Sequence, residues 1–356
     1  MMDARFKAPV EHAPRRQRGM SLMEVLVAMA IAMVGVIIMM QVLLTSEERA
    51  RTTGAGSDAL SNGAVMMHLL QRDVMQAGYG INSTNLLGCD LVLPTGRTIP
   101  LAPVRINPDA AIIPAGDAHT DTLLVVYGSD NGQPEGNAIS SVGTDAYSVQ
   151  SPGAFSKDDY VVASPGTCAA ALTLAKVTGV GGSDVSVDAV QADGTILYNL
   201  GKAPRVLAFA VRNGSLTSCD LMVSDCTVAN AASWPAVGGS IVSLRAQYGR
   251  DTTAGAMDGI VDEWDQTHPA NACGWARATG LRFVLVARSA QYESAIDQVT
   301  GQRTCEQVTT GARTWSGSET APIDLSGNAD WQCYRYQTLE SVAPARNVLW
   351  MGQTGC

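Results

Sequence analysis

The sequence predicts an α+β fold in which one long N-terminal helix packs on an antiparallel β-sheet head. Two observations carry this prediction. An almost uninterrupted apolar run, Val25 to Leu44, leads into a stretch of helical periodicity that ends at Gly78 and Gly80. Beyond these glycines, short strand-like runs alternate with turn-forming Gly, Pro, Asn and Asp residues over the rest of the chain.

The first 44 residues place a basic leader, a glycine and an apolar run in an unusual order. Arg15, Arg16 and Arg18 precede Gly19, and the apolar run follows with one carboxylate, Glu24, near its start. A secretory signal has its small-residue cleavage site after the apolar region, whereas the candidate processing point here, Gly19, precedes it. The apolar segment is therefore expected to stay on the mature protein.

The run Val25–Leu44 has the length of a membrane span. As a helix it extends for about 30 Å, which matches the hydrocarbon core of a bilayer, and the leader arginines place its N-terminal end in the cytoplasm. A carboxylate charged at the bilayer centre costs about 2.5–3.5 kcal/mol, so Glu24 needs compensation. The candidates are the helix dipole and a freed α-amine on Met20. The alternative is an acidic residue snorkelling on a signal anchor.

A helical pattern continues after the apolar run. Apolar side chains recur at spacings of three and four residues from Leu60 to Ala77, which predicts one apolar helix face. Gly54 and Gly56 weaken the helix before this face by about 1 kcal/mol each. A continuous helix from Met20 to Ala77 would be about 87 Å long. The alternative is an anchor, a linker and a separate short helix.

Six runs of β-branched and apolar residues predict strands of the head. They are Thr122–Tyr127, Tyr160–Ala163, Val185–Val190, Arg205–Val211, Ile241–Tyr248 and Leu281–Ala287. The last run alternates as a half-buried antiparallel strand does. The chain therefore divides into a leader (1–19), a transmembrane or filament-core helix (20–44), an amphipathic second half of the helix (45–80) and a β-rich globular head (81–356).

All eight cysteines lie beyond the apolar run, and an even number on the exported side indicates disulfides formed in the periplasm. No C-x-x-C pair occurs and the histidines are scattered, so no zinc site is expected. The segment between Cys219 and Cys226 is long enough for a hairpin that brings their Cα atoms within the roughly 4.4–6.8 Å that a disulfide needs. We predict that these two are bonded, while the other pairings stay open.

Charge and motifs exclude several functional classes. The formal net charge is −9, and the leader carries +3, so its removal leaves −12. Direct binding of nucleic acid by so acidic a chain is not expected. The sequence contains no G-x-S-x-G, H-E-x-x-H, G-x-x-x-x-G-K-[ST] or G-x-G-x-x-G motif, so no catalytic residues are predicted and the chain is not expected to be an enzyme.

One acidic loop, Asp251 to Glu263, contains the oxygen ligands that Ca²⁺ prefers. Its carboxylates are those of Asp251, Asp258, Asp262 and Glu263. The loop departs from the EF-hand pattern, because Thr253 and Gly255 stand where that pattern has carboxylate or amide ligands. A plain hairpin turn is the preferred interpretation, with weak calcium binding as the alternative, and no other cofactor is expected.

From Arg18 to Leu44 the sequence closely resembles the N-terminus of type IV prepilins. The resemblance implies that a prepilin peptidase cuts between Gly19 and Met20 and methylates the new amino terminus of Met20. Glu24 then falls where the family carries its characteristic glutamate, important for assembly. Met20 replaces the commoner phenylalanine.

Residues 278–289 and 330–347 resemble the end of PilW-type minor pilins. This implies a single-pass protein of the bacterial inner membrane with a periplasmic head, which then joins a pilus at the cell surface. The implied partners are other minor and major pilins and the prepilin peptidase, and the implied activities are pilus priming at the tip, twitching motility, adhesion and DNA uptake. The alternatives are a J-like pseudopilin of type II secretion and, more remotely, a signal-anchored periplasmic enzyme.

Overall fold

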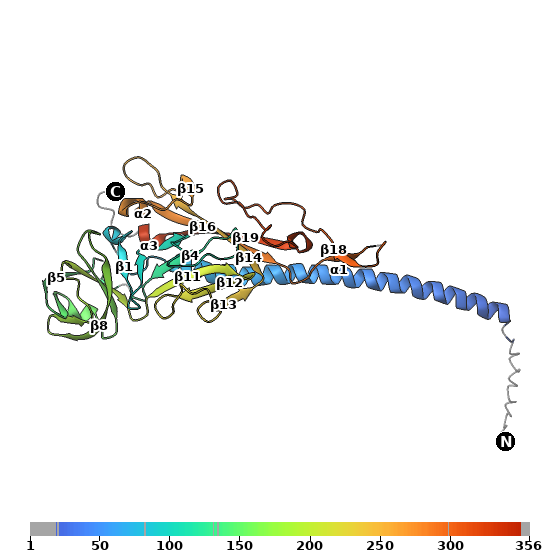
Figure 1. Cartoon of the computed structure of the whole chain (residues 1–356), viewed down its shortest axis with the longest axis horizontal. Coiled ribbons are helices and arrows are strands. Elements are labelled where there is room, and N and C mark those ends of the chain that lie inside the picture. Colours follow the sequence, from blue (N-terminus) through green and yellow to red (C-terminus); the bar gives the residue numbers. More distant parts are fainter. Residues whose placement is uncertain are drawn as a thin grey trace, which may run out of the picture. The chain divides into compact units, whose positions relative to one another are not determined.

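The computed structural model describes residues 19, 21–81, 83–130, 132–133, 135–297 and 299–349. It contains two compact units, residues 1–53 and 54–356, which are described separately. Figure 1 labels the elements. Among the described residues, a long helix precedes four largely antiparallel sheets, one of them a two-stranded hairpin, so the predicted α+β fold is confirmed. The helices are α1 (Leu22–Gln76), α2 (Ala272–Ala276), α3 (Arg346–Leu349) and the short 3₁₀ turns Thr84–Leu86, Pro152–Ala154 and Trp331–Cys333.

The first unit contains the N-terminal part of α1. Every large apolar side chain from Leu22 to Leu44 is exposed, with exposed fractions of 38–81%. Within the described residues, one helical segment, Leu22–Glu47, is long and apolar enough to cross a membrane. The helix continues without a break through Gly54 and Gly56. The alternative of an anchor, a linker and a separate short helix is therefore wrong, because the structure has one continuous helix.

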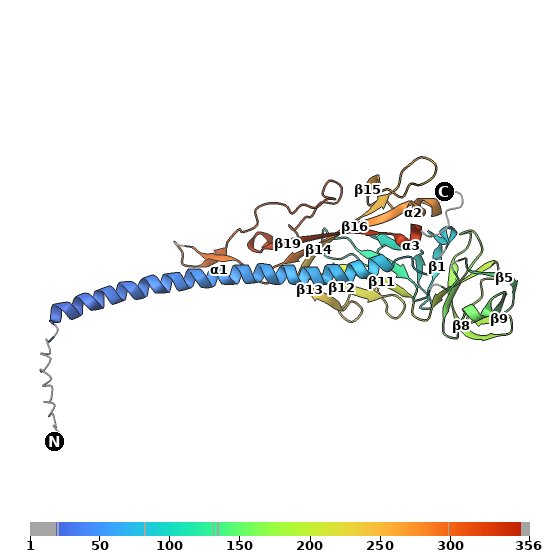
Figure 2. The same ribbon diagram turned by 180° about the vertical axis from the view of Figure 1, so that it is seen from behind.

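In the second unit, residues 54–76 of α1 bury one face in the head. Figure 2 shows this part of the helix running past β11, β12 and β13. Met67, Leu70 and Val74 are buried as predicted. Leu60, however, is 50% exposed, and the buried face runs through Ala59 and Gly63 instead.

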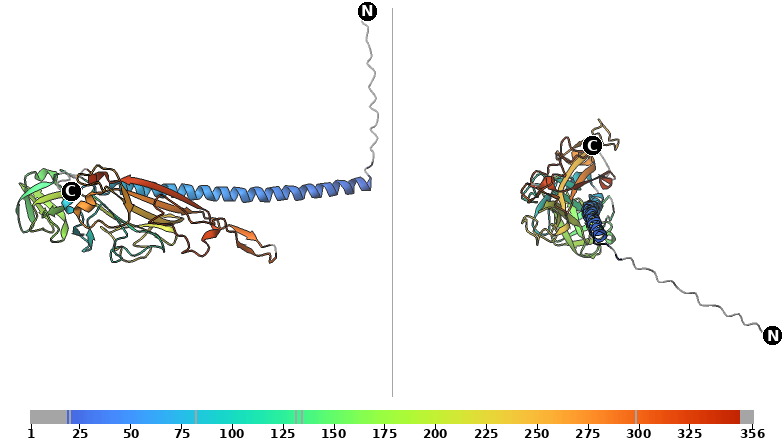
Figure 3. Two further views of the ribbon diagram at one scale, coloured as in Figure 1. Left: turned by 90° about the horizontal axis from the view of Figure 1, so that it is seen from above. Right: turned by 90° about the vertical axis from the view of Figure 1, so that its right-hand side faces the viewer.

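Gly63 explains this shift of the buried face. A Cβ there would lie 2.6 Å from Leu339 Cδ1 and 3.0 Å from Ala287 Cβ. Because the glycine has no side chain, the helix approaches β16 and β19 closely at this point. Figure 3 shows β19 alongside this part of the helix.

The helix ends where the glycines predicted its end. Gly78 and Gly80 have φ angles of 79° and 80°, which favour glycine. Asn347, near the far end of the chain, donates from Nδ2 to the carbonyls of Gln76 (3.2 Å) and Ala77 (3.0 Å). Two carbonyls left unpaired by the end of the helix are thus capped by a residue of α3.

The largest sheet has eight strands in the order β2-β1-β8-β7-β10-β5-β6-β9, with β1 and β8 parallel and the other pairs antiparallel. Some of its buried side chains, among them Tyr147, form a separate apolar cluster with Phe155, while others, such as Leu91 and Leu172, belong to the main core. The strands are β1 (Asp90–Val92), β2 (Thr98–Pro100), β5 (Asn137–Val142), β6 (Ala146–Val149), β7 (Tyr160–Ser164), β8 (Leu172–Gly181), β9 (Asp184–Val187) and β10 (Ile196–Gly201).

Two smaller sheets share the main core with the second half of α1. One has the order β13-β12-β11-β4-β3, with β3 (Val104–Ile106), β4 (Leu123–Tyr127), β11 (Arg205–Arg212), β12 (Ser215–Asp220) and β13 (Ala236–Gly239). The other has the order β15-β14-β16-β19, with β14 (Ile241–Arg250), β15 (Glu263–Asp265), β16 (Ala278–Arg288) and β19 (Tyr336–Pro344). A separate hairpin pairs β17 (Ser294–Ile296) with β18 (Arg303–Cys305).

Strand β16 corrects one expectation. The sequence predicted a half-buried strand over Leu281–Ala287, but β16 is buried on both faces. Phe283 and Leu285 belong to the main core, whereas Val284 and Val286 pack in a second cluster with Trp315 and Ile323. The chain after β18 covers the face that the alternation had assigned to solvent.

Candidate processing and assembly site

The residues expected at the processing point lie just before α1. Gly19 and Ser21 are among the described residues, while Met20 and the basic leader lie outside them. Cleavage between Gly19 and Met20 and methylation of Met20 therefore stay predictions. The first residue of α1 is Leu22, so the helix begins within three residues of Gly19.

Ser21 caps the N-terminus of α1. Its Oγ accepts a hydrogen bond from the backbone N–H of Glu24 at 3.2 Å, and its carbonyl accepts from the N–H groups of Glu24 (3.0 Å) and Val25 (3.2 Å). This is N-cap geometry, which is worth about 1 kcal/mol to a helix. Sequence reasoning missed this function of Ser21, although the S-x-x-E pattern of a capping box is present at Ser21–Glu24.

Glu24 stands in the first turn of α1, exposed, where the positive end of the helix dipole stabilises a carboxylate. It forms no ion pair with any of the described residues. No other charged residue occurs between Glu24 and Glu47. The first turn therefore presents a single negative charge at one end of a helix surface that is apolar on all sides up to Leu44, apart from Gln41, as in a membrane span or a buried helix.

The structure joins Cys219 to Cys226, with their Cα atoms 5.8 Å apart. Cys219 lies in β12, and the Trp234 indole N–H donates to the Cys226 carbonyl at 3.1 Å. Cys89 is bonded to Cys168 and Cys305 to Cys333, and Cys273 is also in a disulfide. Cys356 lies outside the described residues.

The carboxylates of the acidic loop bond to the loop's own backbone. Asp251 accepts from the N–H groups of Thr253 and Gly259, Asp258 from that of Ile260, and Asp262 from that of Thr252. Burial raises the pKa of Asp251, but these hydrogen bonds and the Arg277 charge together lower it below its ordinary value. Among the described residues, no three His, Cys, Asp or Glu side chains are grouped as metal ligands would be.

Calcium binding by this loop stays a prediction, and we expect it to be weak. For dissociation constants of about 10⁻⁴ to 10⁻³ M, 1 mM Ca²⁺ would stabilise the protein by about 0.4–1.4 kcal/mol. Thermal unfolding with calcium and with chelator measures this difference. A difference that persists in Asp258→Ala and Asp262→Ala would place the ion elsewhere.

Comparison with known proteins found one matching family and one similar solved structure. Residues 14–40 match the family described as the prokaryotic N-terminal methylation motif. Among solved structures, the chain is similar to a type IV-like pilin from Thermus thermophilus, at 10% sequence identity and a TM-score of 0.31, over 82% of this chain and 96% of that one. No curated protein matches the sequence. The chain thus carries a prepilin-type methylation motif that spans Gly19 and Glu24.

Proposed function

We propose that this protein is a minor pilin: a structural subunit, not an enzyme, that is cut after Gly19, methylated at Met20 and polymerised through α1. The observation that carries the proposal is the order of features around residue 19. A basic leader and a glycine come first, and a capped helix with Glu24 in its first turn follows. The match to the N-terminal methylation motif over residues 14–40 supports it.

This order of leader, glycine, helix cap and Glu24 also suggests why assembly would depend on cleavage of the leader. Cleavage would create an α-amine on Met20, one residue before the N-cap Ser21 and four before Glu24. The first turn would then present a cation and a carboxylate, either of which can pair with its counterpart on a neighbouring subunit. Inside a low-dielectric helix bundle an unpaired charge is costly, so a subunit with a mismatched terminus would be disfavoured.

The head, from residue 54 onward, would then be displayed outside the membrane. Its disulfides suit an oxidising compartment such as the periplasm. We infer that the inner membrane holds the subunit before assembly and that its partners are other minor and major pilins and the prepilin peptidase. Priming of the pilus tip, and through it twitching motility, adhesion and DNA uptake, would be activities of the whole machine.

The test is the intact mass and N-terminal sequence of the protein extracted from membranes, with and without an active prepilin peptidase. The proposal expects a chain that begins at Met20 and carries one added methyl group only when the peptidase is active. A mature chain that retains Arg18 and Gly19 would contradict it. Loss of pili rather than of protein secretion in a deletion strain separates a minor pilin from a type II secretion pseudopilin.

A further inference from the structure

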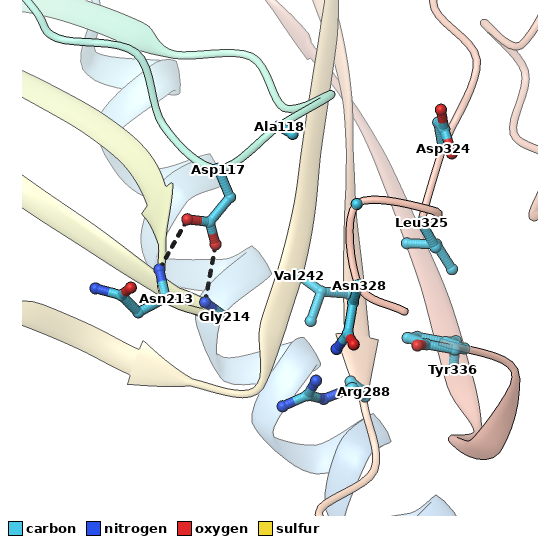
Figure 4. A pocket seen from close by; sticks show the side chains of 11 residues that line it. Asp117, Ala118, Asn213, Gly214, Val242, Arg288, Asp324, Leu325, Asn328 and Tyr336 are labelled. Carbon is cyan, nitrogen blue, oxygen red and sulfur yellow. Dashed lines mark hydrogen bonds between the residues drawn. The ribbon is translucent and has the colours of Figure 1, made fainter. Parts of the chain in front are cut away.

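A cavity of about 310 Å³ opens in the head. Its walls come from six parts of the chain: the connection before β4, the β11–β12 turn, the ends of β14, β16 and β19, and the loop 324–328. Figure 4 shows its lining side chains. The volume is at the lower end of the range for small-molecule sites, so the cavity would hold one small ligand.

Arg288, at the end of β16, supplies the positive charge of the cavity. Its guanidinium carbon lies 4.4 Å from the centre of the Tyr334 ring, a cation–π contact that orients the group. Its Nε is buried without a hydrogen-bond partner, and no described residue accepts a hydrogen bond from its terminal nitrogens. An unpartnered, oriented guanidinium matches a carboxylate, which can accept two parallel hydrogen bonds from it.

Two carboxylates line another part of the cavity, and Figure 4 shows both well separated from Arg288. Asp117 accepts hydrogen bonds from the backbone N–H groups of Asn213 and Gly214, one on each oxygen and both at 2.9 Å. Asp324 accepts from the Ser326 N–H at 2.9 Å, and hydrogen bonds from Ser326 lower its pKa. Each carboxylate oxygen can accept more than one hydrogen bond, so both groups can still bind hydroxyl donors.

The remaining wall combines the polar side chains of Asn213 and Asn328 with apolar surface. Tyr336 lines the cavity with its ring, because its hydroxyl donates to the Trp331 carbonyl at 2.9 Å. Burial raises the pKa of Tyr336 to about 12, so the ring stays neutral. Val242 and Leu325 add aliphatic surface. A ligand here needs an anionic end, donor groups at a distance from that end, and C–H surface between them.

We propose that this cavity binds a sugar acid, such as a uronic acid unit, with its carboxylate on Arg288, its hydroxyls on Asp117 and Asp324 and its ring against Tyr336. A neutral sugar would leave Arg288 unpaired. A simple acid would make no use of the spare acceptor capacity of the two aspartates, and a cation would meet the guanidinium. The sugar acid can contact all three charged groups, independently of whether the chain assembles into a pilus.

Titration calorimetry on the full-length protein in detergent tests the ligand class, with sodium D-glucuronate as the probe. We expect glucuronate to bind more tightly than D-glucose, sodium acetate or L-serine. Equal binding of glucose would overturn the carboxylate contact, and equal binding of acetate would overturn the contribution of the two aspartates. If serine bound as tightly as glucuronate, the proposed ligand class would be wrong and an amino acid would take its place. If glucuronate did not bind at tens of millimolar, the proposed site would be overturned.

Variants test the residues. Arg288→Gln should weaken glucuronate binding at least about tenfold, because a charge-assisted bidentate contact is lost. Arg288→Lys should weaken it less, since an ammonium keeps the charge but not the fork. The matched control is Arg105→Gln in β3, whose Nε is also buried without a partner but which does not line the cavity.

Unfolding curves in the same detergent establish that each variant is folded. If Arg288→Gln does not fold, Arg288→Lys and the more exposed Asp324→Asn decide the question by the same titration. Unchanged affinity in the folded Arg288 variants, or an equal loss in Arg105→Gln, would overturn the proposal.

Discussion

The two halves of α1 are both rich in apolar residues, but the first half exposes these side chains whereas the second half buries many of them. From Leu22 to Leu44 every large apolar side chain is exposed, whereas Met66, Met67, Leu70 and Val74 are buried in the head. Packing within the chain therefore stabilises the second half but not the first. The apolar surface of the first half needs lipid or other helices, and its only charge is at Glu24.

The largest effect should come from the charge in the first half. We expect Glu24→Ala to give a protein that is processed and held in the membrane but nearly absent from filaments, because the amine created by cleavage loses its partner. The measurement is the amount of the subunit in sheared pili relative to membranes.

Glu47→Ala is the matched control, since Glu47 is also an exposed carboxylate of α1 but lies at the other end of the apolar segment. If the Glu24→Ala variant were incorporated normally into sheared pili, Glu24 would not be required for assembly. Equal loss in both variants would mean that total charge, and not the position of Glu24, matters.

A leucine truncation in each half separates packing within the head from packing with other molecules. Leu70 is fully buried, so Leu70→Ala should lower the free energy of unfolding by about 2–5 kcal/mol. Leu26 is 54% exposed, and Leu26→Ala should leave the unfolding of the head unchanged. Urea unfolding of the full chain in detergent measures both. A comparable loss in Leu26→Ala would show that the first half also packs within the chain.

The second half of α1 is also joined to the head by a polar contact. Tyr127 of β4 donates to Asp73 of α1 at 3.3 Å, and Asp73 is only 5% exposed. Burial, and then the Asp73 charge, raise the pKa of Tyr127 from 10.0 to about 12. The unfolded chain therefore loses this proton at lower pH than the folded chain does, so the contribution is complete below pH 10 and lost as pH rises toward 12.

We expect this contribution to be about 1–2 kcal/mol, after allowance for partial solvent screening of the pair. Unfolding free energies at pH 9 and pH 11 should differ by more in the wild type than in Tyr127→Phe. A wild type and a Tyr127→Phe variant with the same pH dependence would show that the contact does not couple helix and sheet.

The sequence predicts those parts of the fold whose determinants are local. The apolar run and its flanking charges require no knowledge of the rest of the chain, and the six predicted strands each overlap an observed strand, β4, β7, β9, β11, β14 or β16. Three-residue strands such as β1 and β2 were missed because so short a run gives no measurable alternation.

Features that depend on distant contacts were not predictable from local pattern. The second face of β16 is covered by Trp315 and Ile323, and the buried Asp73 accepts a hydrogen bond from Tyr127 of a distant strand. The cavity around Arg288 joins segments more than 200 residues apart in sequence, from Asp117 to Tyr336. Ser21 is the exception, since its capping pattern is local and readable.

The smallest effect should come from glycines of α1. Gly63→Ala gains about 1 kcal/mol of helix propensity but inserts a methyl group 3.0 Å from Ala287 Cβ, where overpacking costs about 1–3 kcal/mol. Gly56→Ala gains the same propensity with no atom within 4 Å of the new Cβ. We therefore expect Gly56→Ala to stabilise the helix and Gly63→Ala to range from neutral to destabilising by about 2 kcal/mol. If both variants stabilised the head equally, close packing at Gly63 would not be what shifts the buried face away from Leu60.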